Sequence, residues 1–110
     1  MTCWNSTNQS PIHDHNGSKC WVKMLSGKLT ETHYTLTPNA ESWCKSESKT
    51  LHAGSVYELE ETVIHSMKNN VSERAVCLIL LVPGYEECCQ YEPDTGERKA
   101  ICIKELLHAS

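Results

Sequence analysis

Two histidines separated by a single residue, His13 and His15, have the clearest capacity for chemistry in this sequence. In an extended segment, residues i and i+2 lie on the same face about 6–7 Å apart, so both imidazoles can reach one metal ion while Asp14 points the other way. Such a pair also arises by chance on an exposed strand, and neutral imidazole binds iron, zinc, copper and nickel alike. The pair therefore indicates a metal site without naming the metal.

Longer spacings around this pair resemble the two motifs of the cupin family. Four residues separate His15 from Cys20, and six more precede Gly27, which is the spacing of the first cupin motif with a cysteine in place of its glutamate. Ten residues separate Gly54 from His65, and three separate His65 from Asn69. These intervals resemble the glycine, histidine and asparagine spacing of the second cupin motif.

Three positions depart from the cupin motifs. Thr7 stands where the first motif opens with glycine, and Glu60 and Thr62 stand where the second usually has proline and glycine. These departures affect turns, whereas the resemblance implies that His13, His15 and His65 are metal ligands. Three neutral donors leave Fe(II) with its full charge, which an anionic substrate sulfur can offset.

A more specific resemblance, to eukaryotic cysteine dioxygenase, begins at Cys3-Trp4 and is densest from Ser10 to Thr32. It continues more thinly through His65 to about Ile103, and it covers nearly all of this chain but only the later part of a family member. The resemblance implies that Fe(II) is the cofactor, that L-cysteine binds through its thiolate and amine, and that O2 oxidises the sulfur to cysteine sulfinic acid.

Cys20 matches the family cysteine that forms a thioether with a tyrosine near the iron, but the tyrosine itself is replaced by Leu81. Because this partner is missing, we predict no thioether at Cys20. A family histidine two residues before the tyrosine is also replaced, by Ile79. Tyr85 follows four residues after Leu81 and is a candidate to supply the missing phenol.

The substrate contacts are not identified by the sequence. The resemblance implies that the family arginine that binds the substrate carboxylate precedes the region covered here. Arg74 and Arg98 fall at positions that favour turns and are predicted to be solvated surface charges. We therefore expect weaker selection of cysteine over other small thiols.

Short apolar and β-branched segments between turn residues predict an all-β fold. Together with the resemblance, they predict one cupin domain over residues 1–110, a double-stranded β-helix or jelly-roll barrel that is incomplete at its amino terminus. The turn at Asp94–Glu97 predicts a hairpin, Lys104–Ala109 a short helix, and the apolar run Cys77–Val82 a central strand covered on both faces. The expected strands are Trp21–Leu25, Leu29–Leu36, Ser55–Leu59, Thr62–His65, Ala75–Val82 and Lys99–Lys104.

Composition disfavours several other classes of protein. The net charge of −4 gives no surplus to bind nucleic acid or anionic lipid. No apolar run is long enough to span a membrane and no leader is visible, so we expect a cytoplasmic chain, monomeric if complete. Seven cysteines, an odd number without a CxxC pair, favour reduced thiols over a disulfide framework or a structural zinc site.

Two other readings remain open beside the dioxygenase. One is a non-catalytic metal-binding cupin fragment or isoform, and the other is a β-barrel without metal. The remaining histidines are predicted to lie at the surface: His33, His52 and His108. The tryptophans are predicted to lie in the core or at its rim: Trp4, Trp21 and Trp43.

Overall fold

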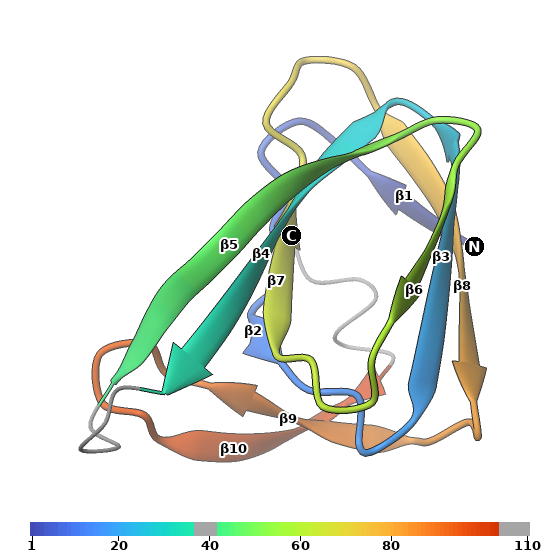
Figure 1. Ribbon diagram of the computed structural model, residues 1–110. Coiled ribbons are helices and arrows are strands. Elements are labelled where there is room, and N and C mark those ends of the chain that lie inside the picture. Colours follow the sequence, from blue (N-terminus) through green and yellow to red (C-terminus); the bar gives the residue numbers. More distant parts are fainter. Residues whose placement is uncertain (37–41, 104–110) are drawn as a thin grey trace.

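The computed structural model of the chain describes residues 1–36 and 42–103, and it contains two antiparallel sheets (Figure 1). The four-stranded sheet has the order β1 (Thr2–Trp4), β8 (Ala75–Val82), β3 (Lys19–Ser26) and β6 (Val56–Leu59). The six-stranded sheet has the order β10 (Arg98–Cys102), β9 (Glu87–Tyr91), β2 (Ile12–His13), β7 (His65–Lys68), β4 (Lys28–Leu36) and β5 (Trp43–His52). Within the described ranges, no helix has the length and apolar character to cross a bilayer.

The core lies between the two sheets, where alternate side chains of each strand point inward. In β3, Cys20, Val22 and Met24 are all buried, whereas the residues between them are at least partly exposed. Inward-facing residues of the other strands complete the cluster: Trp4, Leu29, Leu51, Leu59, Met67, Ala75 and Cys77. The predicted all-β class and the core position of Trp4 are confirmed.

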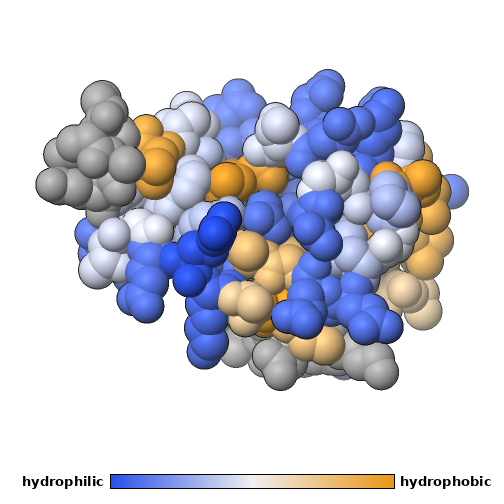
Figure 2. Space-filling view, turned by 90° about the horizontal axis from the view of Figure 1, so that it is seen from below, coloured by the Kyte–Doolittle hydropathy of each residue, from blue (hydrophilic) through white to orange (hydrophobic). Residues whose placement is uncertain are grey.

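Strand β8 lies between β1 and β3, which agrees with the predicted central position, but it is not covered on both faces. Leu78, Leu80 and Val82 are 42%, 58% and 50% exposed. Figure 2 shows hydrophobic surface at its right-hand edge, the side on which β3 and β8 lie in Figure 1. The prediction was wrong because an apolar run shows that a strand is hydrophobic but not that another layer packs on each face.

The longest strand, β5, was not predicted. Its burial pattern explains this, because Leu51 is its one buried residue and most of the others are exposed polar side chains. Backbone pairing with β4 over nine positions, from Lys28↔His52 to Leu36↔Trp43, holds it in the sheet. Backbone pairing does not require apolar side chains, so the hydropathy of the sequence does not reveal it.

The predicted hairpin is present and one predicted strand is displaced. Strands β9 and β10 pair antiparallel around the turn that contains Asp94–Glu97. The expected strand Thr62–His65 is a turn and irregular segment, and β7 begins where that prediction ends. The expected helix Lys104–Ala109 lies outside the described residues.

Thr7, the departure from the glycine of the first motif, adopts a φ of 70°. This left-handed conformation is unfavourable for a β-branched residue. We expect Thr7→Gly to raise the free energy of unfolding by about 1 kcal/mol, as measured by denaturant titration. Asn16→Gly is the matched control, because Asn16 has a φ of 49° and asparagine tolerates this region. Equal effects of the two substitutions would contradict the expectation.

Candidate metal centre

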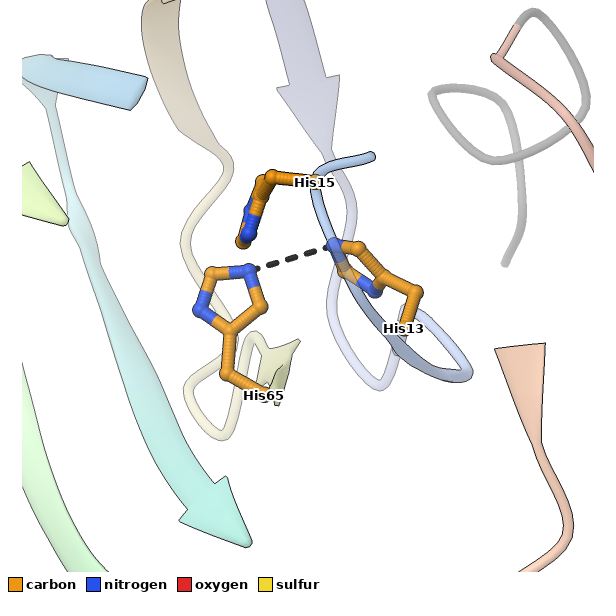
Figure 3. A group of neighbouring side chains, drawn as sticks. All are labelled: His13, His15 and His65. Carbon is orange, nitrogen blue, oxygen red and sulfur yellow. Dashed lines mark hydrogen bonds between the residues drawn. The ribbon is translucent and has the colours of Figure 1, made fainter. Parts of the chain in front are cut away.

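Three buried histidines meet between the sheets (Figure 3). His13 lies in β2, His15 follows two residues later, and His65 opens β7 directly opposite His13 in the strand pairing. The ring centroid of His65 is 4.6 Å from those of both His13 and His15, and the latter two centroids are 5.3 Å apart. Local chain geometry thus brings two histidines together, and cross-strand pairing adds the third.

The hydrogen bonds of the three rings turn one particular nitrogen of each toward the others. Nδ1 of His13 donates to the Pro11 carbonyl at 2.9 Å, and Nδ1 of His15 donates to the Val63 carbonyl at 3.3 Å. Nδ1 of His65 lies 3.1 Å from Oε2 of Glu31. Because each acceptor is an oxygen, Nδ1 of each ring carries a proton, which leaves Nε2 as the nitrogen that can bind a metal ion.

Two of these Nε2 atoms lie within hydrogen-bonding distance of each other. Nε2 of His13 and Nε2 of His65 are 3.1 Å apart, the hydrogen bond drawn as a dashed line in Figure 3. Desolvation by burial and the neighbouring histidines lower the pKa of His13 well below its usual value. Burial, followed by the effect of His65, lowers the pKa of His15 to about 4. The rings of His13 and His15 are therefore neutral near pH 7.

This arrangement fits a divalent metal ion. Two imidazole nitrogens that bind one ion at about 2.1 Å, with an angle near 90°, lie about 3.0 Å apart. The potential ligand nitrogens of all three histidines lie within 4.8 Å of one another. His13, His15 and His65 could therefore hold an ion through three neutral donors.

Asp14 points away from the other side chains of the His-x-His segment, as the alternation of an extended chain predicts. Its carboxylate accepts a hydrogen bond from the Cys89 backbone at 3.0 Å and one from the Tyr91 hydroxyl at 2.9 Å. These bonds fix the segment against β9 and hold the two flanking histidines toward the interior.

Glu31, which was not predicted from the sequence, contacts the histidine cluster through Nδ1 of His65. It is fully buried in β4 and accepts hydrogen bonds from His65 and from His33. His33 is only 18% exposed at its side chain, so the prediction of a surface histidine was wrong; His52 is exposed as predicted, and His108 lies outside the described residues. The available signal was a glutamate at a core-facing position, two residues after Leu29.

A small cavity adjoins the histidines. Its volume is about 30 Å³, room for an ion or a water molecule. Cys20, Ile79, Leu81, Tyr85 and Ile103 also line it.

Cys20 and Leu81 are direct partners across β3 and β8, so the position of the family tyrosine is beside Cys20 but carries no phenol. Burial raises the pKa of the Cys20 thiol to about 12, which keeps it protonated. The Tyr85 hydroxyl is buried and has no hydrogen-bond partner among residues 1–36 and 42–103, and burial raises its pKa. Tyr85 therefore brings an unsatisfied donor to the wall of the cavity.

The two arginines do not line this cavity. Arg74 is exposed and donates to the Asn5 side chain at 3.2 Å, as expected for a surface charge. Arg98 is also exposed, but it opens β10 rather than lying in a turn.

Comparison with known proteins identifies the family. The model of the family described as cysteine dioxygenase type I matches residues 1–94. Cysteine dioxygenase type 1 of Rattus norvegicus and that of Homo sapiens are each 30% identical over 107 residues, which covers 94% of this chain and 53% of theirs. The protein of the same name from Danio rerio is 28% identical over 105 residues, covering 92% and 52%. The chain thus spans about half the length of these relatives.

Solved structures support the fold. An oxalate oxidase matches with a TM-score of 0.59 and 11% identity, covering 94% of this chain and 44% of that one. The oxalate decarboxylase of Lactobacillus farciminis matches with a TM-score of 0.56 and 18% identity, covering 98% and 27%. These likenesses and the two antiparallel sheets confirm the predicted cupin fold. The family match and the sequence identity together show that the chain belongs to the cysteine dioxygenase type I family.

Proposed function

We propose that this chain is an iron-dependent thiol dioxygenase that converts L-cysteine and O2 to cysteine sulfinic acid, with His13, His15 and His65 as the Fe(II) ligands. The observation that carries the proposal is the convergence of three buried imidazole rings, with Nε2 of His13 and Nε2 of His65 3.1 Å apart. Membership of the cysteine dioxygenase family supports the choice of metal and substrate. The reaction would take place in the cytoplasm, in a monomeric chain.

The charge of the site suits a thiol substrate. Three neutral imidazoles leave the positive charge of a bound ion uncompensated, so they favour a substrate that arrives as a thiolate. Bound Fe(II) would supply a binding position for the sulfur and for O2. The balance is RSH + O2 → RSO2H: two sulfur–oxygen bonds form, the O–O bond breaks, and the sulfur is oxidised without an external reductant.

Tyr85 would contribute the phenol of the site. No phenol adjoins Cys20 at Leu81, and the Tyr85 hydroxyl is buried at the cavity with no hydrogen-bond partner in the part of the chain that the structure describes. A buried donor that lacks an acceptor costs about 1–3 kcal/mol, which a bound ligand with an acceptor atom would recover. Tyr85 would therefore bind and orient the substrate through a hydrogen bond, with no covalent bond to Cys20.

A second candidate is a metal-binding protein without dioxygenase activity. The observation that favours it is the apolar wall formed by Leu81 and Ile79 next to Cys20.

One experiment separates these two functions. The chain is loaded anaerobically with Fe(II) and exposed to L-cysteine and O2, and mass spectrometry follows both the small molecule and the protein. We expect sulfinate from the parent, none from His65→Ala, and less from Tyr85→Phe, which retains the three histidines. Iron bound without sulfinate would favour the non-catalytic protein, and a parent that binds no iron would exclude both.

A further inference from the structure

The side of His65 that faces away from the histidine cluster carries a second group of ionisable residues. Glu31 is 0% exposed, and its Oε2 lies 3.1 Å from Nδ1 of His65. His33 lies two residues further along β4, on the same face, and its Nε2 contacts Oε1 of Glu31. Each oxygen of the buried carboxylate therefore has its own imidazole donor.

The buried carboxylate has a third polar partner besides the two imidazoles. Lys49, on the neighbouring strand β5, places its Nζ 3.7 Å from Oε1. A buried anion persists only where partners of this kind compensate for lost hydration.

An anion at this position distinguishes His65 from the other two histidines. Nδ1 of His13 and Nδ1 of His15 each donate to a neutral backbone carbonyl, whereas Nδ1 of His65 donates to a carboxylate. A charged acceptor forms the stronger hydrogen bond, fixes the proton on Nδ1, and makes Nε2 a better electron donor. It also brings one negative charge near a centre whose own donors are neutral.

We propose that Glu31, held by His33, is a positioning residue that strengthens the binding of a divalent transition-metal ion through His65. The proposal rests on the proposed metal site and adds two residues to it. His33 acts through Glu31: its donor satisfies the second carboxylate oxygen and keeps the first one aimed at His65.

The same residues could form a different arrangement. Ligand atoms of Glu31, His33 and His65 lie within 4.8 Å of one another and could hold a second ion that shares His65. Both Glu31 oxygens already accept hydrogen bonds from imidazoles, and this favours the positioning role. The two arrangements differ in the number of ions bound per chain.

The test titrates the full metal-free chain with Co(II), whose visible absorption spectrum reports on its ligands. The parent is expected to bind one ion. Glu31→Gln, which keeps an acceptor oxygen but loses the charge, should raise Kd 10–100-fold and shift the absorption bands. His33→Leu should raise Kd less, and the double variant should match Glu31→Gln alone because the two residues act in series.

Glu58→Gln on β6 is the matched control, since it removes one exposed carboxylate and should leave Kd and spectrum unchanged. Should Glu31→Gln fail to fold by circular dichroism, the half-buried His33→Leu provides the decisive comparison. Unchanged Kd and spectrum in the folded variants would overturn the inference while leaving the proposed function intact. Two ions bound by the parent and one by His33→Leu would overturn the positioning role of Glu31 in favour of a second metal site. A parent that binds no Co(II) would overturn both this inference and the proposed metal site.

Discussion

Replacement of His13 with alanine is expected to abolish the stabilisation of the chain by divalent metal. In the parent, an ion that binds only the folded state and is present at 100 times its Kd adds about 2.7 kcal/mol to the free energy of unfolding. This corresponds to a rise in Tm on the order of 10 °C for a domain of this size. In His13→Ala one of the three converging nitrogens is missing, so the rise in Tm with Co(II) should fall to near zero.

Thermal unfolding followed by circular dichroism, with and without Co(II), measures this effect. His52→Ala is the matched control, because His52 is an exposed histidine at the end of β5, and it should keep the full metal-dependent rise. An equal rise in His13→Ala and the parent would show that the ion binds elsewhere. Comparison of the metal-free proteins separates the loss of a ligand from general damage to the fold.

Gly27→Ala is expected to destabilise the chain by about 2–4 kcal/mol, the largest effect we anticipate on the fold. Gly27 joins β3 to β4 with a φ of 71°. A Cβ at this position would lie 2.7 Å from the Arg74 carbonyl oxygen and 2.8 Å from the Ala75 Cα. Both are backbone atoms, so relief of the contact requires β8 to move away from the turn.

Gly54→Ala separates the two causes of this loss. Gly54 also has a positive φ, 87°, but a Cβ there would meet nothing within 4 Å. The control should therefore lose only the conformational term, about 1 kcal/mol. Denaturant unfolding of both variants gives the difference, and losses of similar size would show that the packing of Gly27 against β8 contributes little.

Features that depend on short segments of the chain could be predicted from the sequence. The His13-x-His15 pair follows from strand geometry, because residues two apart share a face whatever surrounds them. The resemblance of the Gly54–His65–Asn69 spacing to the second cupin motif implied which distant histidine joins them, and the structure brings that histidine opposite His13. The β9–β10 hairpin was likewise predictable, since its turn depends on a short segment.

Other features depended on which strands become neighbours. Strand β5 is polar along almost its whole length and is held by pairing with β4, which hydropathy does not encode. The exposed outer face of β8 could not be inferred because its sequence is apolar on both sides. In each case the sequence does not show which element lies next to the strand.

By itself, the sequence determined the all-β class, the family resemblance and the three histidines that can reach one ion. Only the tertiary structure decided what lies behind and beside them. Glu31 and His33 come together with His65 because β4 and β7 pair in one register, and Tyr85 reaches the cavity because the chain turns back after β8. These contacts join residues far apart in the chain, and their energies depend on burial and on hydrogen bonds that form once the sheets have closed.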